Sequence, residues 1–217
     1  PQHNETLMLK AFNLSKAGNL EEAKQIYLDI LTLTPSNTGA RERVSSLYQQ
    51  QGDTKNALYH LDLLIKDEFD NADYLLRKAA LQLEAGQRAD AEKTLSIVRN
   101  FINDDAGKLI AYADQARRVD NDENALDAMA RAYQIANTST FVTLRYVSLL
   151  LDMQNNDKAQ SLLTTIPANQ QQNPVYYFLK GRLAANKGNS ELAIKEFEKA
   201  LDVDATFAQA FVAIYNY

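Results

Sequence analysis

The stretch "GNSELAIKEFEKALDVDA" at residues 188–205 indicates the architecture, because a similar stretch occurs near the start of the chain. The earlier copy, "GNLEEAKQIYLDILTLTP", occupies residues 18–35. Both copies open with Gly-Asn, place Ala five residues after the Gly, and carry an aromatic residue, Phe197 or Tyr27, four residues later. Two such copies in one chain indicate an internal repeat.

The copies belong to a repeat with one fixed step and no insertion or deletion. Alanine recurs at that step, at Ala23, Ala57, Ala91, Ala125, Ala159 and Ala193. Five residues before each alanine lies a turn position, occupied by Gly18, Gly52, Gly86, Asp120, Gln154 and Gly188. Four residues after each alanine the residue is large and apolar: Tyr27, Leu61, Leu95, Met129, Leu163 and Phe197. Twelve residues before it the residue is nearly always small: Ala11, Ser45, Ala79, Ala113, Val147 and Gly181.

Each of these columns has a physical reason. The segments before and after each turn position have helical periodicity, for instance "LMLKAFNLSKA" followed by "LEEAKQIYLDILTL". Glycine tolerates the left-handed backbone that ends the first helix, and the Asn or Asp that usually follows suits the start of the second. Small residues let two helices approach closely, and the large column fills the groove between them. The sequence therefore predicts helical hairpins that stack on their neighbours.

These columns resemble those of the tetratricopeptide repeat (TPR) family, whose 34-residue pattern has small residues and an aromatic in the same places. The resemblance implies an all-α, right-handed superhelical solenoid of six helix-turn-helix units. The units are expected at residues 4–37, 38–71, 72–105, 106–139, 140–173 and 174–207, followed by a partial helix at 208–217. Two departures stand out: proline ends only the first unit, at Pro35, and the fourth and fifth units lack the turn glycine.

Composition excludes several classes of function. A net charge of −5 and a pI near 5.1 oppose a nucleic-acid binder, which needs a basic face. The strict period also opposes the similar, slightly longer helical repeats that read RNA. The chain has no cysteine, so thiolate metal sites and a cysteine nucleophile are excluded. No apolar run approaches the roughly 18 residues that span a bilayer, so we expect no direct membrane insertion.

Residues for catalysis or metal binding are scarce. The two histidines, His3 and His60, lie more than one unit apart. "DNDEN" at 120–124 resembles the start of a calcium loop, but Ala125 and Arg131 replace the required Gly and Glu. With no glycine-rich phosphate loop either, the sequence predicts a non-enzymatic chain with no catalytic residues, no metal and no cofactor.

The remaining candidate is a surface, since the resemblance implies a concave groove lined by the first helices and occupied by a peptide or partner protein. The groove residues predicted from the columns are Met8, Phe12, Arg43, Leu76, Arg77, Ile110, Leu144, Arg145, Phe178 and Arg182. Arginine pairs bidentately with carboxylates. We therefore expect Arg43 and Arg77 to anchor an acidic group of the partner, while Leu76, Ile110 and Leu144 receive apolar side chains. The alternative is that the arginines are solvated or pair with nearby acids such as Glu42 and Asp73.

Co-chaperones that resemble this fold grip the C-terminal carboxylate of heat-shock chaperones with a clamp of Lys, Asn, Asn, Lys and Arg. The corresponding residues in the first three units are Met8, Phe12, Arg43, Asp73 and Arg77. Since only Arg77 matches, the sequence disfavours binding of such a tail.

The segment "AQAFVAIYNY" at 208–217 aligns with the first helix of a seventh unit, and Phe211, Ile214 and Tyr215 are expected to await another helix. We expect the natural protein to continue there; the alternatives are an apolar cap and self-association through this face. The leading prediction is a protein–protein interaction scaffold, and the alternative is the targeting array of a longer enzyme. The style of the repeats is similar to long bacterial arrays of cell-envelope and polysaccharide-export systems, which slightly favours the envelope over the cytoplasm.

Overall fold

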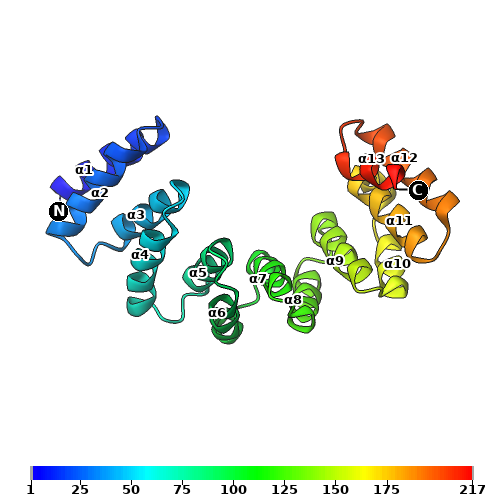
Figure 1. The fold of residues 1–217 in the computed structure, drawn as a ribbon, viewed down its shortest axis with the longest axis horizontal. Helices are drawn as coiled ribbons and strands as arrows, with labels where there is room; N and C mark the ends of the chain where they lie inside the picture. Colours follow the sequence, from blue (N-terminus) through cyan, green and yellow to red (C-terminus); the bar gives the residue numbers. More distant parts are fainter. Residues whose placement is uncertain (1, 217) are drawn as a thin grey trace. The chain divides into compact units, whose positions relative to one another are not determined.

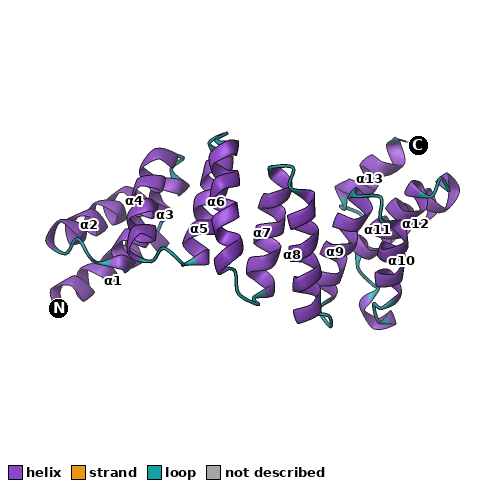
Figure 2. Ribbon diagram, turned by 90° about the horizontal axis from the view of Figure 1, so that it is seen from below, coloured by secondary structure: helices purple, strands orange, loops and turns teal. Residues whose placement is uncertain are grey.

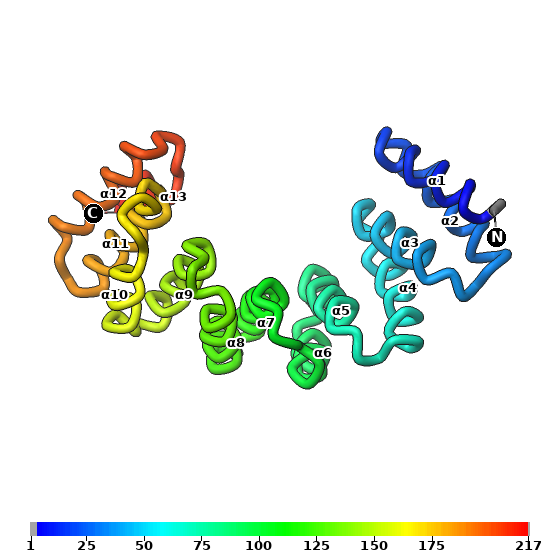
Figure 3. Tube along the Cα trace, turned by 180° about the vertical axis from the view of Figure 1, so that it is seen from behind, coloured from blue at the N-terminus to red at the C-terminus, as the bar shows by residue number. Residues whose placement is uncertain are grey.

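The computed structural model describes the backbone of residues 2–216 and the side chains of residues 4–216. Within this range the chain forms 13 α-helices and one 3₁₀ turn, is 79% helical and contains no strand (Figures 1 and 2). Short turns reverse the chain direction between consecutive helices along the trace (Figure 3). The predicted all-α TPR solenoid is confirmed at the level of fold class.

The helix bounds repeat at the predicted step. The first helices of the hairpins are α1 (Gln2–Lys16), α3 (Thr38–Gln50), α5 (Ala72–Glu84), α7 (Ala106–Arg118), α9 (Thr140–Asp152), α11 (Pro174–Asn186) and α13 (Ala208–Tyr215). The second helices are α2 (Leu20–Leu33), α4 (Thr54–Asp67), α6 (Arg88–Phe101), α8 (Asp122–Ile135), α10 (Asn156–Thr164) and α12 (Ser190–Val203). From α3 onward each first helix begins one full repeat after the previous one, and so does every second helix.

One helix departs from this regularity. Helix α10 ends at Thr164, whereas one repeat back from the end of α12 at Val203 would place its end at residue 169. Pro167 lies in the missing turn and begins the connection to a short 3₁₀ turn, η1 (Ala168–Gln170). Proline lacks a backbone N–H and disfavours a helical conformation at the residue before it, so the second helix of the fifth unit stops early.

The turns inside the hairpins share one backbone conformation. Gly52 has φ 75° and the other turn glycines have similar values, in the left-handed region. Asp120 and Gln154, which replace glycine in the fourth and fifth units, adopt φ 57° and 59°. A residue with a Cβ pays about 1–2 kcal/mol in this region, so the packing of the hairpins imposes the turn even where the sequence does not favour it.

The chain divides into two compact units, which are described separately. The first comprises residues up to Asn103 together with Gln115–Asp120, and the second comprises Asp104–Asp114 together with the residues from Asn121. No helix in the described range is long and apolar enough to cross a membrane.

The core of each compact unit is formed by the residues of the columns that define the repeat. The alanines of the second helices, such as Ala57 and Ala193, are completely buried, and so is Ser45, whose hydroxyl donates to the carbonyl oxygen of Ala57 at 2.9 Å. The closest approach is at Gly181, where an added Cβ would lie 2.4 Å from the ring of Phe197. Glycine at this position lets α11 pack directly on the aromatic ring of α12.

Candidate functional site

In the first compact unit, the predicted groove residues come from α1, α3 and α5. The guanidinium carbon of Arg43 lies 5.5 Å from the centre of the Phe12 ring, so these two residues form a cation–π contact between α3 and α1. Met8 is half-buried on the same helix as Phe12, whereas Leu76 on α5 is buried and only 6% exposed. The structure thus brings Arg43 to Phe12 and leaves it without a carboxylate at salt-bridge distance among the described contacts.

Arg77 on α5 is half-buried in a polar cluster. Its Nε donates to Oε1 of Gln49 at 3.3 Å, while its Nη2 is buried and makes no hydrogen bond. Burial lowers the pKa of Arg77, and the charge of nearby Glu42 opposes that shift. The Glu42 carboxylate itself accepts a hydrogen bond from the hydroxyl of Tyr74. The pKa of Tyr74 is raised, mainly by burial and secondly by this hydrogen bond.

In the second compact unit, three predicted groove residues line one pocket. The pocket has a volume of about 370 Å³ and is formed by α9, α11 and the residues around the start of α13. Its lining comprises Thr140, Phe141, Leu144, Arg145, Ser148, Asn173, Val175, Phe178, Leu179, Phe207 and Gln209. We call it the α9–α11 pocket. Two other predicted groove residues, Ile110 and Arg182, are not part of its lining. Ile110 is half-buried, and Arg182 pairs with Asp152.

The arginines near this pocket are already paired. Arg145 contacts both carboxylate oxygens of Asp114, and Arg182 binds Asp152 at 2.5 Å and the hydroxyl of Ser148 at 3.3 Å. For these two arginines the structure therefore shows pairing with nearby acids, although with partners other than Glu42 and Asp73. The α9–α11 pocket consequently combines apolar walls with a charge-compensated rim.

Several residues of the pocket lie outside the columns that predicted the groove. Phe141 is 64% exposed at its edge, and Phe207 closes it from the segment before α13. A large apolar residue at the second position of a unit was the available signal for Phe141, because the three preceding units have Gly39, Asp73 and Gly107 there. Phe207 gave no such signal, since it lies outside the columns assigned to the groove.

Sequence profiles decide the family. A tetratricopeptide repeat profile matches residues 32–214, and a second profile of the same description matches residues 5–37. The chain belongs to the tetratricopeptide repeat family.

Several solved structures have a similar fold. The structure titled as the functional characterization of Pseudomonas aeruginosa pilF is 14% identical, covers 100% of this chain and 98% of its own, and has a TM-score of 0.70. YrrB, described as a TPR protein with an unusual peptide-binding site, is 14% identical, with coverage of 86% and 96% and a TM-score of 0.66. MamA is 20% identical, with coverage of 79% and 94% and a TM-score of 0.63. Among curated proteins, no sequence matches this chain significantly.

The last TPR helix, α13, exposes apolar side chains. Phe211 is 67% exposed and Tyr215 is 86% exposed, whereas Ile214 packs partly against the cluster that contains Phe197. Residues at the position of Phe211 in earlier repeats, such as Leu75 and Leu109, are buried. Phe211 and Tyr215 are thus the exposed apolar residues of this face, and Ile214 is partly buried.

Features that could suggest metal binding have structural explanations. Among the described residues, no group of three or more His, Asp or Glu side chains is placed to hold a metal ion. In the "DNDEN" segment, Asp120 pairs with Arg88, and the side chain of Asn121 caps α8 by accepting from the backbone N–H of Asn124 at 3.3 Å. His60 is buried and stacks on Tyr48, and burial lowers its pKa. The side chain of His3 lies outside the described residues.

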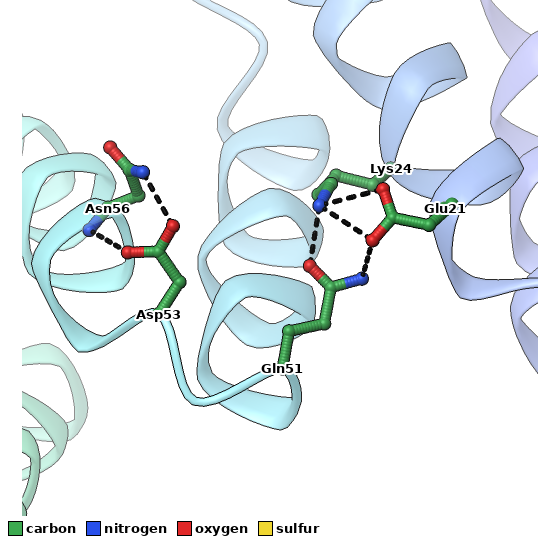
Figure 4. Close-up of polar contacts among 5 residues, drawn as sticks. All are labelled: Glu21, Lys24, Gln51, Asp53 and Asn56. Atoms are coloured by element: carbon green, nitrogen blue, oxygen red, sulfur yellow. Dashed lines mark hydrogen bonds and ion pairs between the residues drawn. The ribbon is translucent and has the colours of Figure 1, made fainter.

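A polar cluster links the first and second hairpins of the array (Figure 4). Lys24 on α2 contacts Glu21 at 3.0 Å and Oε1 of Gln51 at 2.5 Å, and Gln51 donates to Glu21 at 2.6 Å. Nearby, Asp53 accepts from the backbone N–H of Asn56 at 3.1 Å, which caps α4. Hydrogen bonds from the Asn56 side chain and backbone lower the pKa of Asp53. The hydrogen bonds of Gln51 with Lys24 and Glu21 therefore join the first hairpin to the second, whereas the bonds between Asp53 and Asn56 are local to the start of α4.

Proposed function

We propose that this chain is a non-catalytic scaffold that binds a peptide or a segment of a partner protein through its first helices. The observation that carries the proposal is the α9–α11 pocket, which gathers Leu144, Arg145 and Phe178 in one cavity. Its volume of about 370 Å³ suits one large apolar side chain with part of the adjoining backbone. Membership of the TPR family and the peptide-binding site named for YrrB support this function.

The chemistry of the pocket defines the expected ligand. Phe141, Leu144 and Phe178 offer apolar and aromatic surface, which favours a leucine, methionine or aromatic side chain of the partner. Asn173 and Ser148 supply polar groups at the edge for the partner backbone. Because Arg145 is neutralised by Asp114, the pocket needs no anionic ligand.

The first compact unit contributes a second recognition element in this proposal. Arg43 and Arg77 are the groove cations without a carboxylate partner at salt-bridge distance among the described contacts. A carboxylate of the partner would pair with these guanidinium groups. Charge reversal at Arg43 and Arg77 is therefore expected to weaken binding of ligands with an acidic group by about tenfold.

The experiment is a selection of random 12-residue peptides displayed on phage against the immobilised chain, followed by fluorescence anisotropy with the enriched peptides. Phe141→Glu places a charge at the exposed edge of the pocket and should weaken binding by about tenfold or more. Phe69→Glu is the matched control, because Phe69 is 66% exposed and lies outside the pocket lining. The proposal fails if no peptide is enriched, or if Phe141→Glu binds the selected peptides as tightly as the unmodified chain.

A further inference from the structure

A second cavity lies against another face of α11. It has a volume of about 490 Å³ and is lined by Gln160, Leu163, Thr164, Tyr176, Lys180, Leu183, Ala184, Lys187, Leu192 and Glu196, from α10, α11 and α12. We call it the lysine cavity. With 3.6 residues per turn, the α11 residues that line it point away from Val175, Phe178 and Leu179, which line the α9–α11 pocket.

The lysine cavity contains a buried carboxylate at a position where the array usually places an uncharged residue. Glu196 is 3% exposed. In the five earlier units, the equivalent positions hold Ile26, His60, Thr94, Ala128 and Leu162. Removing a carboxylate from water is costly unless charges and hydrogen bonds compensate it, so packing alone does not account for a glutamate here.

Two lysines compensate this carboxylate in different ways. Lys199 donates to Oε1 of Glu196 at 2.6 Å, and this hydrogen bond raises the pKa of Lys199. Lys180 has its Nζ 3.2 Å from Oε2, yet Oε2 makes no hydrogen bond. This second contact is therefore an electrostatic pair whose geometry lies outside that of a hydrogen bond. One carboxylate thus serves two ammonium groups, and the three groups together keep a net positive charge.

A third lysine, Lys187, lies at the C-cap position directly after the last residue of α11. Lys187 follows Lys180 by seven residues, which is about 10.5 Å along a helix axis. Its ammonium group donates to the amide oxygen of Gln160, a neutral partner. Leu183 and Ala184 lie between the two lysines on the cavity wall, and Leu163 and Leu192 flank them from α10 and α12. The cavity therefore presents an apolar floor between two ammonium groups.

The early end of α10 lies beside the lysine cavity. Thr164 is the last residue of α10 and is part of the cavity lining. The turn that the repeat would place after it is replaced by Pro167 and the 3₁₀ turn η1. The lysine cavity is therefore lined by residues from two departures from the repeat. One is the buried glutamate of the sixth unit, and the other is the shortened helix α10.

We propose that the lysine cavity binds an acidic amphipathic helix of a partner protein. Apolar side chains of that helix enter among Leu163, Leu183 and Leu192, and two carboxylates seven residues apart pair with Lys180 and Lys187. Charge complementarity selects this occupant: the chain as a whole carries −5, yet the charged lining residues are two lysines and one glutamate that is already paired. This site is separate from the pocket of the proposed function and does not depend on it.

The experiment uses a display library of 15-residue peptides with Glu fixed at positions 4 and 11, Leu fixed at positions 7 and 8, and the other positions random. A parallel library has Lys at positions 4 and 11. The purified chain should enrich helical peptides from the first library only, and isothermal titration calorimetry should show that Lys187→Glu weakens their binding by about tenfold. Lys195→Glu is the matched control, because Lys195 is exposed on α12 and is not part of the lining.

Four outcomes would overturn the proposal. The first is the absence of enrichment from the acidic library, and the second is equal enrichment from the lysine library. The third is an equal loss of binding in Lys187→Glu and Lys195→Glu, which would indicate general attraction to the acidic peptide. The fourth is binding to vesicles that contain an anionic phospholipid with no binding of any peptide, which would assign the cavity to a lipid surface.

Discussion

The two cavities on α11 differ in how they treat charge. In the α9–α11 pocket the cations near the rim are neutralised, since Arg145 pairs with Asp114 and Arg182 with Asp152. In the lysine cavity a single buried carboxylate, that of Glu196, is shared by Lys180 and Lys199. One helix thus offers an apolar, charge-compensated pocket through one face and a positively charged cavity through another. The difference shows that the binding chemistry of a repeat array depends on departures from its columns as much as on the columns.

The column that contains Glu196 has a second buried ionisable residue, in the first compact unit. His60 occupies the position of Glu196 in the second unit of the array, and it too is buried. His60 has no ion-pair partner among the described residues and stacks on Tyr48, while burial lowers its pKa and so favours the neutral imidazole. A buried ionisable group therefore marks a charged site only where counter-charges accompany it.

Removing both lysines that compensate Glu196 is expected to have the largest effect. In Lys180→Ala/Lys199→Ala the carboxylate stays buried without a cation, and the chain should lose about 2–3 kcal/mol of unfolding free energy. This value lies below the usual range for a fully buried pair because the two lysine side chains are 36% and 39% exposed. Urea denaturation followed by circular dichroism measures the loss.

The control for this prediction is Glu196→Leu, which restores the type of residue found at Leu162. On its own it should change stability by about 1 kcal/mol or less, and combined with the two lysine changes it should recover most of the lost stability. If the double lysine variant is as stable as the unmodified chain, Glu196 does not depend on its cations and the contrast between the two faces of α11 disappears.

Gly181→Ala tests the contact that fixes α11 between the two cavities. The added Cβ would lie 2.4 Å from the Phe197 ring, so α11 or the ring must move. Overpacking costs about 1–3 kcal/mol, and the better helix propensity of alanine returns up to about 1 kcal/mol. We expect a net loss of about 1–2 kcal/mol, measured by urea denaturation.

Phe197→Leu combined with Gly181→Ala provides the matched test, because the third unit uses this pairing at Ala79 and Leu95. Phe197→Leu should reduce the free energy of unfolding less when residue 181 is alanine than when it is glycine. An additive loss in the double variant would show that Gly181 and Phe197 are not coupled.

His60 should produce the smallest effect, confined to acidic pH. Its pKa is lowered in the folded state, so the unfolded state binds the proton more readily. The contribution of neutral His60 to stability is complete above the unfolded pKa of about 6.5 and declines as the pH falls toward the folded value. The denaturation midpoint should therefore decrease less between pH 7 and pH 5 in His60→Leu than in the unmodified chain. Equal decreases would show that His60 does not contribute to the pH dependence.

The sequence predicted the architecture well because the fold depends on local rules repeated many times. The turn positions, the small column and the large column each have a steric cause, and together they predict helices that recur at one fixed step. Even Asp120 and Gln154 obey the register, since the neighbouring helices impose the left-handed turn that glycine adopts without strain. The early end of α10 was missed, although Pro167 could have indicated it.

The candidate site was predicted less completely, because side-chain pairing across units does not follow from the columns. Leu144, Arg145 and Phe178 were placed in one groove, and the structure does bring them to one pocket. Arg145 and Arg182 pair with acids of the preceding hairpin. These pairs depend on side-chain rotamers, and a sequence column does not specify rotamers. Glu196 was visible in the sequence as a lone acid in an otherwise uncharged column, but its burial and its two lysines required coordinates.

The most direct test of the account is a calorimetric titration of the chain with an acidic helical peptide selected for the lysine cavity, performed with and without a saturating peptide selected for the α9–α11 pocket. If α11 carries two separate binding faces, the affinity for the acidic peptide should be the same in both titrations, and Phe141→Glu should weaken only the binding of the pocket peptide, by about tenfold or more. Competition between the two peptides, or loss of both in Phe141→Glu, would contradict the account.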